Sequence, residues 1–164
     1  MKEEDSFRIR LFKLINENPG LHFREIQRRL NSAVGKLDYN LYQLERDGKI
    51  FSKRDGRNVR YFSNESDTVS ERKLAVFLRS SLGREILIKA LKAGDHGILL
   101  DGTEKLKPLL DQMMADGIIE ISPIEFGFNV KLKDRSALIK FLKKYGESFI
   151  DSLAASILKL LDEF

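Results

Sequence analysis

Ten lysines and arginines lie between Arg24 and Arg60, against five aspartates and glutamates (10 − 5 = +5). Residues 70–164 carry fifteen against fourteen (15 − 14 = +1), so the positive charge gathers in the first third of the chain. A local excess of cations is typical of a site for a polyanion, because each cation can neutralise a phosphate. A solvated surface could carry the same charge, so the elements that position these side chains must decide between the two interpretations.

The segment 34–46 places polar side chains among those cations. A buried helical stripe with 3-4-3 spacing is predicted for Val34, Leu37, Leu41 and Leu44. At 100° per residue, the opposite face and its flanks then carry Gly35, Lys36, Tyr39, Asn40, Gln43 and Arg46. Amides pair with adenine edges, lysine reaches guanine or phosphate, and a phenol bonds a phosphate or packs on a thymine methyl group. The pattern favours a helix that fits the major groove over a merely polar surface.

The elements around this helix complete an ordered motif. Ser6 is expected to cap a first helix, and this helix is expected to end at Asn-Pro-Gly, residues 18–20. A short apolar step over 21–23 precedes a second helix over 24–30, and 31–33 form a turn. The β-prone runs 49–54 and 58–63 are joined by 55–57, a hairpin signal in which Gly56 supplies positive φ. Two helices separated by a tight turn and followed by a hairpin are the pattern of a winged helix-turn-helix.

The second half follows a similar order after a polar linker over 64–71. Helical patterns over 74–78, 86–91 and 103–115 are followed by strand-like runs over 118–122 and 126–132, which indicates a weak internal repeat. Two further helices are expected over 134–164, broken near Tyr145-Gly146; the last packs on its own domain or forms a dimer helix. The predicted fold is therefore mainly α with small β-hairpins (α+β): tandem winged helix-turn-helix domains at 1–66 and 67–164, the second degenerate and carrying the C-terminal helices.

Several classes of function are disfavoured by what the sequence lacks. It contains no cysteine and no apolar run of the roughly 18 residues that a membrane span requires, so we expect a cytoplasmic protein without membrane contact. His22 and His96 have no metal-ligand spacing to other residues, and neither a phosphate-binding glycine loop nor a nucleophile motif is present. We therefore expect no enzyme activity, no cofactor and no metal.

Three stretches carry a family resemblance: PGLHFREIQRRL, AVGKLDYNLYQLERDGKI and SKRDGRNVRYF. Together they resemble archaeal transcriptional regulators with two winged helix-turn-helix domains, which are relatives of the ArsR and MarR-like group. The resemblance implies that 24–30 is a positioning helix, 34–46 the recognition helix and 53–60 the wing. The chain departs from the family at Asn40, where histidine is common, and in FGFNV of the second hairpin, which lacks the arginines of the first.

The function expected from the sequence is sequence-specific binding of double-stranded DNA by a transcriptional regulator, with the first domain alone reading DNA. A homodimer is expected, with the first or the last helix at the interface, and the transcription machinery is a further candidate partner. The alternative is a winged-helix protein-interaction scaffold in transcription or replication machinery. The candidate DNA-binding residues are Arg24, Arg28, Arg29, Lys36, Tyr39, Asn40, Gln43, Arg46, Lys53, Arg54, Arg57 and Arg60.

Overall fold

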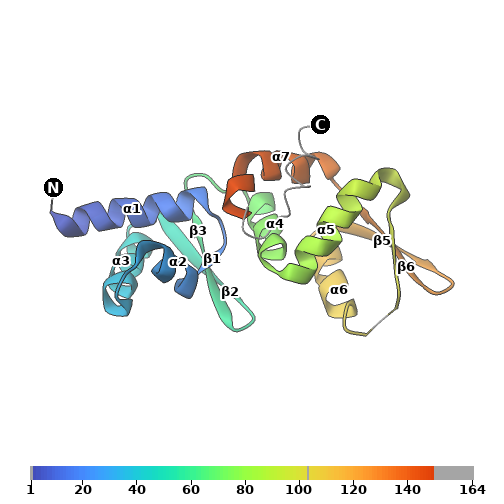
Figure 1. The fold of residues 1–164 in the computed structure, drawn as a ribbon, viewed down its shortest axis with the longest axis horizontal. Helices are drawn as coiled ribbons and strands as arrows, with labels where there is room; N and C mark the ends of the chain where they lie inside the picture. The colour runs from blue at the N-terminus through green and yellow to red at the C-terminus, as the bar shows by residue number, and fades with distance from the viewer. Residues whose placement is uncertain (1, 103, 150–164) are drawn as a thin grey trace. The chain divides into compact units, whose positions relative to one another are not determined.

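The computed structural model describes residues 2–102 and 104–149 and divides into two compact units (Figure 1). Unit 1 is Met1–Val76, and unit 2 begins at Phe77. The sequence placed the domain boundary at residue 66, in the polar stretch, whereas the contacts divide the chain within the helix α4 (Val69–Arg79). Each unit combines helices with a three-stranded antiparallel sheet, so the α+β class is confirmed.

Unit 1 opens with the three helices that the periodicity predicted. They are α1 (Glu3–Glu17), α2 (Phe23–Leu30) and α3 (Val34–Arg46). The expected cap at Ser6 is wrong, because the N-cap of α1 is Lys2, four residues earlier, and Ser6 lies inside the helix. Asn31 closes α2 in the left-handed conformation, at φ 47°, which asparagine tolerates better than most residues do. This conformation turns the chain tightly from α2 into α3.

A small sheet completes unit 1, with strands in the order β1-β3-β2. The strands are β1 (Leu21–His22), β2 (Ile50–Asp55) and β3 (Asn58–Ser63). Asp55 pairs with Asn58 across a two-residue turn, where Gly56 has φ 58° as the hairpin signal required. The sequence indicated β1 only as an apolar step; its pairing with β3 makes it a strand.

The core of unit 1 is formed by apolar side chains of α1, α2, α3 and the sheet. Its buried members are Phe7, Leu11, Ile15, Leu21, Ile26, Leu37, Leu41, Leu44, Ile50 and Tyr61. The predicted stripe of α3 is confirmed at Leu37, Leu41 and Leu44, but it is wrong at Val34, whose side chain is 57% exposed. Val34 is the first residue of α3, so it lies at the end of the helix. The three leucines of α3 therefore anchor this helix in the core.

Unit 2 contains the rest of the described elements. After α4 come α5 (Ser81–Ala93), a 3-10 turn (Gly94–His96), β4 (Ile98–Leu100), α6 (Lys107–Ala115), β5 (Ile119–Ile124), β6 (Gly127–Leu132), α7 (Arg135–Tyr145) and a second 3-10 turn (Gly146–Phe149). The helix predicted from residue 103 begins only at Lys107, with Pro108 in its first turn. The expected final helix falls on 150–164, which lie outside the described residues.

The sheet of unit 2 repeats the strand order and register of unit 1. Its order is β4-β6-β5, and Ile119 pairs with Leu132 as Ile50 pairs with Ser63, 69 positions earlier (119 − 50 = 132 − 63 = 69). The turn before each hairpin is also the same: the amide of Lys49 donates to the carbonyl of Leu44 at 2.9 Å, and Ile118 donates to Met113 at 2.9 Å.

One element of unit 1 has no counterpart in this repeat. Leu21 of β1 pairs with Tyr61, and Ile98 of β4 pairs with Val130. Ile98 lies 77 positions after Leu21, whereas Val130 lies only 69 positions after Tyr61 (98 − 21 = 77; 130 − 61 = 69). Unit 2 is therefore eight residues shorter between its first strand and its hairpin (77 − 69 = 8), which is the length of α2. In the described residues 104–106 of that segment the chain forms turns instead of a helix.

Candidate nucleic-acid interface

The outward face of α3 is aromatic and acidic. Tyr39 is 49% exposed and Tyr42 is 61% exposed, and Asp38 is exposed beside them. Gly35 lies one turn earlier, where a Cβ atom would meet nothing within 4 Å. The exposure of Tyr39 agrees with the expectation from the stripe. Tyr42 and Asp38 were missed. Tyr42 follows the predicted Tyr39 by three residues and Asp38 follows the predicted Gly35 by three, so the spacing could have revealed the shared face.

Two amide side chains that the sequence predicted on this face are buried instead. Asn40 is fully buried: its Oδ1 accepts from Nε of Arg8 at 3.2 Å, and its Nδ2 donates to the carbonyl of Lys36 at 2.8 Å. Gln43 is only 9% exposed. Neither amide is presented to a partner in this conformation. Asn40 instead joins α3 to α1, because Arg8 belongs to that helix.

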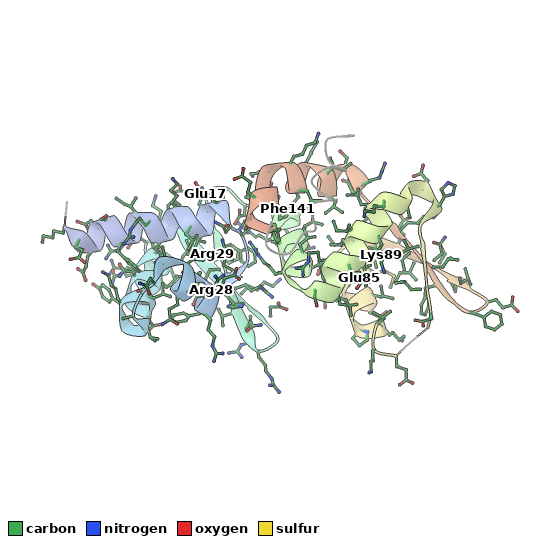
Figure 2. The ribbon with its side chains drawn as sticks, viewed as in Figure 1. Glu17, Arg28, Arg29, Glu85, Lys89 and Phe141 are labelled. Carbon is green, nitrogen blue, oxygen red and sulfur yellow. The ribbon has the colours of Figure 1, made fainter. Side chains whose placement is uncertain are left out.

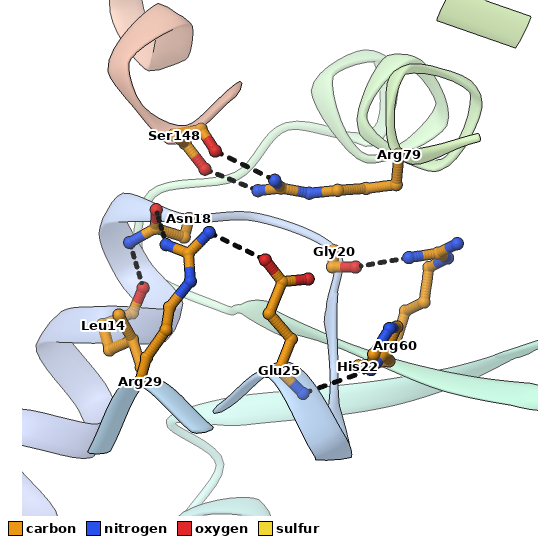
Figure 3. Close-up of polar contacts among 9 residues, drawn as sticks. All are labelled: Leu14, Asn18, Gly20, His22, Glu25, Arg29, Arg60, Arg79 and Ser148. Atoms are coloured by element: carbon orange, nitrogen blue, oxygen red, sulfur yellow. Dashed lines mark hydrogen bonds and ion pairs between the residues drawn. The ribbon is translucent and has the colours of Figure 1, made fainter. Parts of the chain in front are cut away.

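The exposed cations of α2 are Arg24 and Arg28. Arg28 extends from the helix into solvent (Figure 2), and within the described part of the chain neither side chain forms an ion pair. Arg29 differs, because its guanidinium donates to Oε1 of Glu25 at 2.8 Å and to Oδ1 of Asn18 at 3.0 Å (Figure 3). Asn18 donates in turn to the carbonyl of Leu14 at 2.8 Å. Arg29 therefore ties α2 to the end of α1.

The β2–β3 hairpin carries three exposed cations, Lys53, Arg54 and Arg57. The fourth cation assigned to the wing, Arg60, is buried and 6% exposed. Its Nε donates to Oδ2 of Asp55 at 2.6 Å. Another nitrogen of the guanidinium donates to the carbonyl of Gly20 at 2.9 Å (Figure 3). Arg60 thus neutralises a carboxylate of its own hairpin and joins the hairpin to the segment before β1, and we withdraw it from the candidate contacts.

The remaining two cations of α3 have partners within unit 1. Lys36 lies 3.7 Å from a carboxylate oxygen of Glu3 and 4.7 Å from the centre of the Phe7 ring. Arg46 donates to Oδ1 of Asp47 at 3.1 Å. Both pairs are substantially exposed, so water and a polyanion can compete for these cations at small cost.

A groove of about 400 Å³ runs along the outward face of α3, and most of the residues that line it are carboxylates and phenols. Asp38, Tyr39, Tyr42 and Glu45 contribute to it from α3, and Tyr61 contributes from β3. Burial raises the pKa of the Tyr61 hydroxyl above its ordinary 10.0, and the negative charges of Glu45 and Asp38 raise that pKa further. The cations of the candidate interface therefore lie on α2 and the hairpin, whereas the central face of α3 carries carboxylates and phenols.

The shift at Tyr61 predicts how stability depends on pH. Because the unfolded chain releases this proton near 10.0 and the folded chain only at higher pH, the free energy of unfolding should fall as pH rises past that value. Tyr61→Phe should flatten this fall. Urea unfolding between about pH 8 and pH 11 measures it. Tyr42→Phe, which removes an exposed hydroxyl, is the control, and equal flattening by both variants would contradict the assignment.

Comparison with known proteins places a helix-turn-helix within unit 1. Residues 5–74 match the family model described as "HTH_HVO_0163_N, N-terminal HTH domain". The match covers α1 from its third residue, together with α2, α3 and the hairpin. These four elements are called the HTH domain below. The chain is also 26% identical over 150 residues to a protein of Methanocaldococcus jannaschii, named an uncharacterized HTH-type transcriptional regulator, MJ1398. That alignment covers 91% of this chain but only 34% of the relative.

No helix of the described residues is both long enough and apolar enough to span a membrane.

Proposed function

We propose that the HTH domain binds double-stranded DNA in a sequence-specific manner, with α3 in the major groove and the β2–β3 hairpin on the backbone or in a neighbouring minor groove. One observation carries the proposal: an exposed face of α3 occurs in the same unit as five exposed cations without ion pairs in the described chain. These cations are Arg24, Arg28, Lys53, Arg54 and Arg57. Side chains of this kind bind phosphates and set the orientation of a recognition helix, while the helix itself meets the base edges.

Within this proposal the twelve side chains first singled out have different roles. Arg24 and Arg28 hold the backbone beside α2, and the hairpin cations supply affinity that does not depend on sequence. Tyr39 packs on a thymine methyl group or bonds a phosphate, and Tyr42, which is outside the twelve, can do the same. Lys36 and Arg46 can exchange their exposed carboxylate partners for phosphates. The remaining four side chains do not contact DNA and instead hold the elements of unit 1 together. They are Arg29, Asn40, Gln43 and Arg60.

We propose further that unit 2 is a degenerate winged helix that does not read DNA. The offset of 69 aligns Arg54 with Pro123 and Arg57 with Phe126, which is 84% exposed, so the second hairpin has lost the cations of the first. A segment as long as α2 is also missing between its first strand and hairpin. Dimerisation or contact with a protein partner such as the transcription machinery is the role left to unit 2.

The relative's name, an HTH-type transcriptional regulator, supports a role in transcription, and this chain spans about a third of that protein's length. A homodimer is part of the proposal, because two recognition helices about one DNA turn apart bind a pseudo-palindrome far more tightly than one helix does. Sedimentation of the chain with and without duplex measures the stoichiometry.

The salt dependence of duplex binding tests the function. If the five exposed cations each neutralise one phosphate, the slope of log K against log salt should be about −4.5 per HTH domain, and selected duplexes should bind better than random ones. Binding that disappears near physiological salt, or that does not differ between selected and random duplexes, would instead favour the protein-interaction scaffold.

A further inference from the structure

Asp38 is a carboxylate at the centre of the face that we place in the major groove. It is exposed, it is the fifth residue of α3, and within the described chain no cation pairs with it. The nearest cation in sequence, Lys36, contacts Glu3 instead. Gly35, three residues earlier, carries no side chain, and even a Cβ atom there would meet nothing within 4 Å, so this position leaves Asp38 open to a partner. An approaching base edge would therefore meet an ionised acceptor.

A carboxylate at this position discriminates strongly between bases. Ionised aspartate only accepts hydrogen bonds, whereas guanine presents the acceptors O6 and N7 in the major groove and thymine presents the acceptor O4. Adenine presents an N6 amino donor, but its N7 acceptor lies beside that donor and repels a carboxylate. Cytosine presents only the N4 amino donor there. The surrounding phosphates repel the carboxylate, and the hydrogen bond to cytosine must offset that repulsion. At a mismatched base the carboxylate loses its hydration without gaining a donor, so binding is weakened.

We propose that Asp38 is a specificity-determining residue that accepts a hydrogen bond from the N4 amino group of a cytosine. The inference rests on the proposed DNA-binding function and deepens it, because it names one base of the site and the atom that is read. Tyr39 and Tyr42 are exposed and line the same groove as Asp38, so they would meet the same stretch of DNA as the carboxylate.

Glu45 supplies a matched control on the same helix. It follows Asp38 by seven residues, close to two turns, so it shares the face but lies about 10 Å further along the axis. It belongs to the last turn of α3, whereas base contacts come from the N-terminal part of a recognition helix. Glu45→Gln therefore removes one negative charge from the same groove without removing the proposed contact.

Selection of duplexes from a random pool by the full chain, followed by titration of single-base variants, tests the proposal. The wild-type chain should select a C·G pair at one position of each half-site, and exchange of that pair should weaken binding about 5-fold to 100-fold. Asp38→Asn should abolish this preference and shift it towards A·T, because an amide pairs with adenine N6 and N7. Glu45→Gln should keep the wild-type preference.

Three outcomes separate the claims. If Asp38→Asn strengthens binding to all duplexes equally and leaves the base preference unchanged, Asp38 is only a repelling charge and the inference is overturned while the proposed function stands. If Glu45→Gln changes the preference as Asp38→Asn does, the effect belongs to the charge of the groove and the inference is also overturned. If the wild-type chain selects no duplex, the proposed function itself fails. Thermal unfolding of each variant confirms that the exposed substitutions leave the fold intact.

Discussion

Truncating Leu37 to alanine is expected to lower the free energy of unfolding of unit 1 by about 3 kcal/mol. The side chain is completely buried and belongs to the cluster that also contains Leu11, Leu41 and Ile50. Removing its methyl groups forfeits their transfer from water and leaves a cavity that the surrounding helices fill only in part. Leu37 therefore ranks among the residues that hold α3 in place.

Val34→Ala is the matched control for that prediction. The sequence pattern places Val34 in the same stripe, but the side chain is 57% exposed, so the expected change in the free energy of unfolding stays within about 0.5 kcal/mol. Urea unfolding followed by tyrosine fluorescence measures both variants, because Tyr39, Tyr42 and Tyr61 all lie in unit 1. If both variants lowered the free energy of unfolding equally, Val34 would have to be buried as the sequence pattern predicted.

The local elements of unit 1 could be predicted because their signals are local. The helix end at Asn18-Pro19-Gly20, the turn at Asn31 and the hairpin at Gly56 each follow from the conformations that those residues favour. The strand β1 could not be predicted in this way. Two residues show no periodicity, and Leu21 and His22 form a strand only because β3 offers them partners.

The site was predicted less well because burial depends on tertiary packing. The buried residues of α3 cover an arc of about 160° around the helix axis, which is wider than the stripe of leucines alone. They are Leu37, Asn40, Leu41, Gln43 and Leu44. That width could not be read from the leucines, since Asn40 is buried by its contact with Arg8 of α1, 32 positions away. A polar residue beside a stripe is exposed only if no other element covers that side.

The cations of the hairpin show the same limit. Charge counting gives Lys53, Arg54, Arg57 and Arg60 equal weight. In the folded chain Arg60 is committed to Asp55 and to the carbonyl of Gly20, and its guanidinium is no longer available to a phosphate. Which cation of a hairpin is structural depends on the long-range contact with Gly20, and nothing in the local sequence encodes that contact.

The double variant Arg54→Ala with Arg57→Ala is expected to weaken binding to every duplex by about 100-fold, since a charge-assisted hydrogen bond contributes about 1.5 kcal/mol and each such contribution corresponds to about tenfold in affinity. Both side chains are exposed on the hairpin and form no ion pair within the described chain, so their loss should leave the fold unchanged. The salt slope should become less negative by about 1.8, because two phosphates keep their counterions.

The matched control removes two exposed cations from another face of the same unit, Arg10 and Lys13 of α1. Arg10→Ala with Lys13→Ala lowers the net charge by the same amount, so it reproduces any loss that comes from long-range attraction alone. The hairpin variant should lose far more affinity than this control, and by the same factor on selected and on random duplexes, since backbone contacts carry no sequence information. Titration of both variants over a series of salt concentrations measures the difference. An equal effect of the two variants, or a loss confined to selected duplexes, would mean that the hairpin does not bind the backbone.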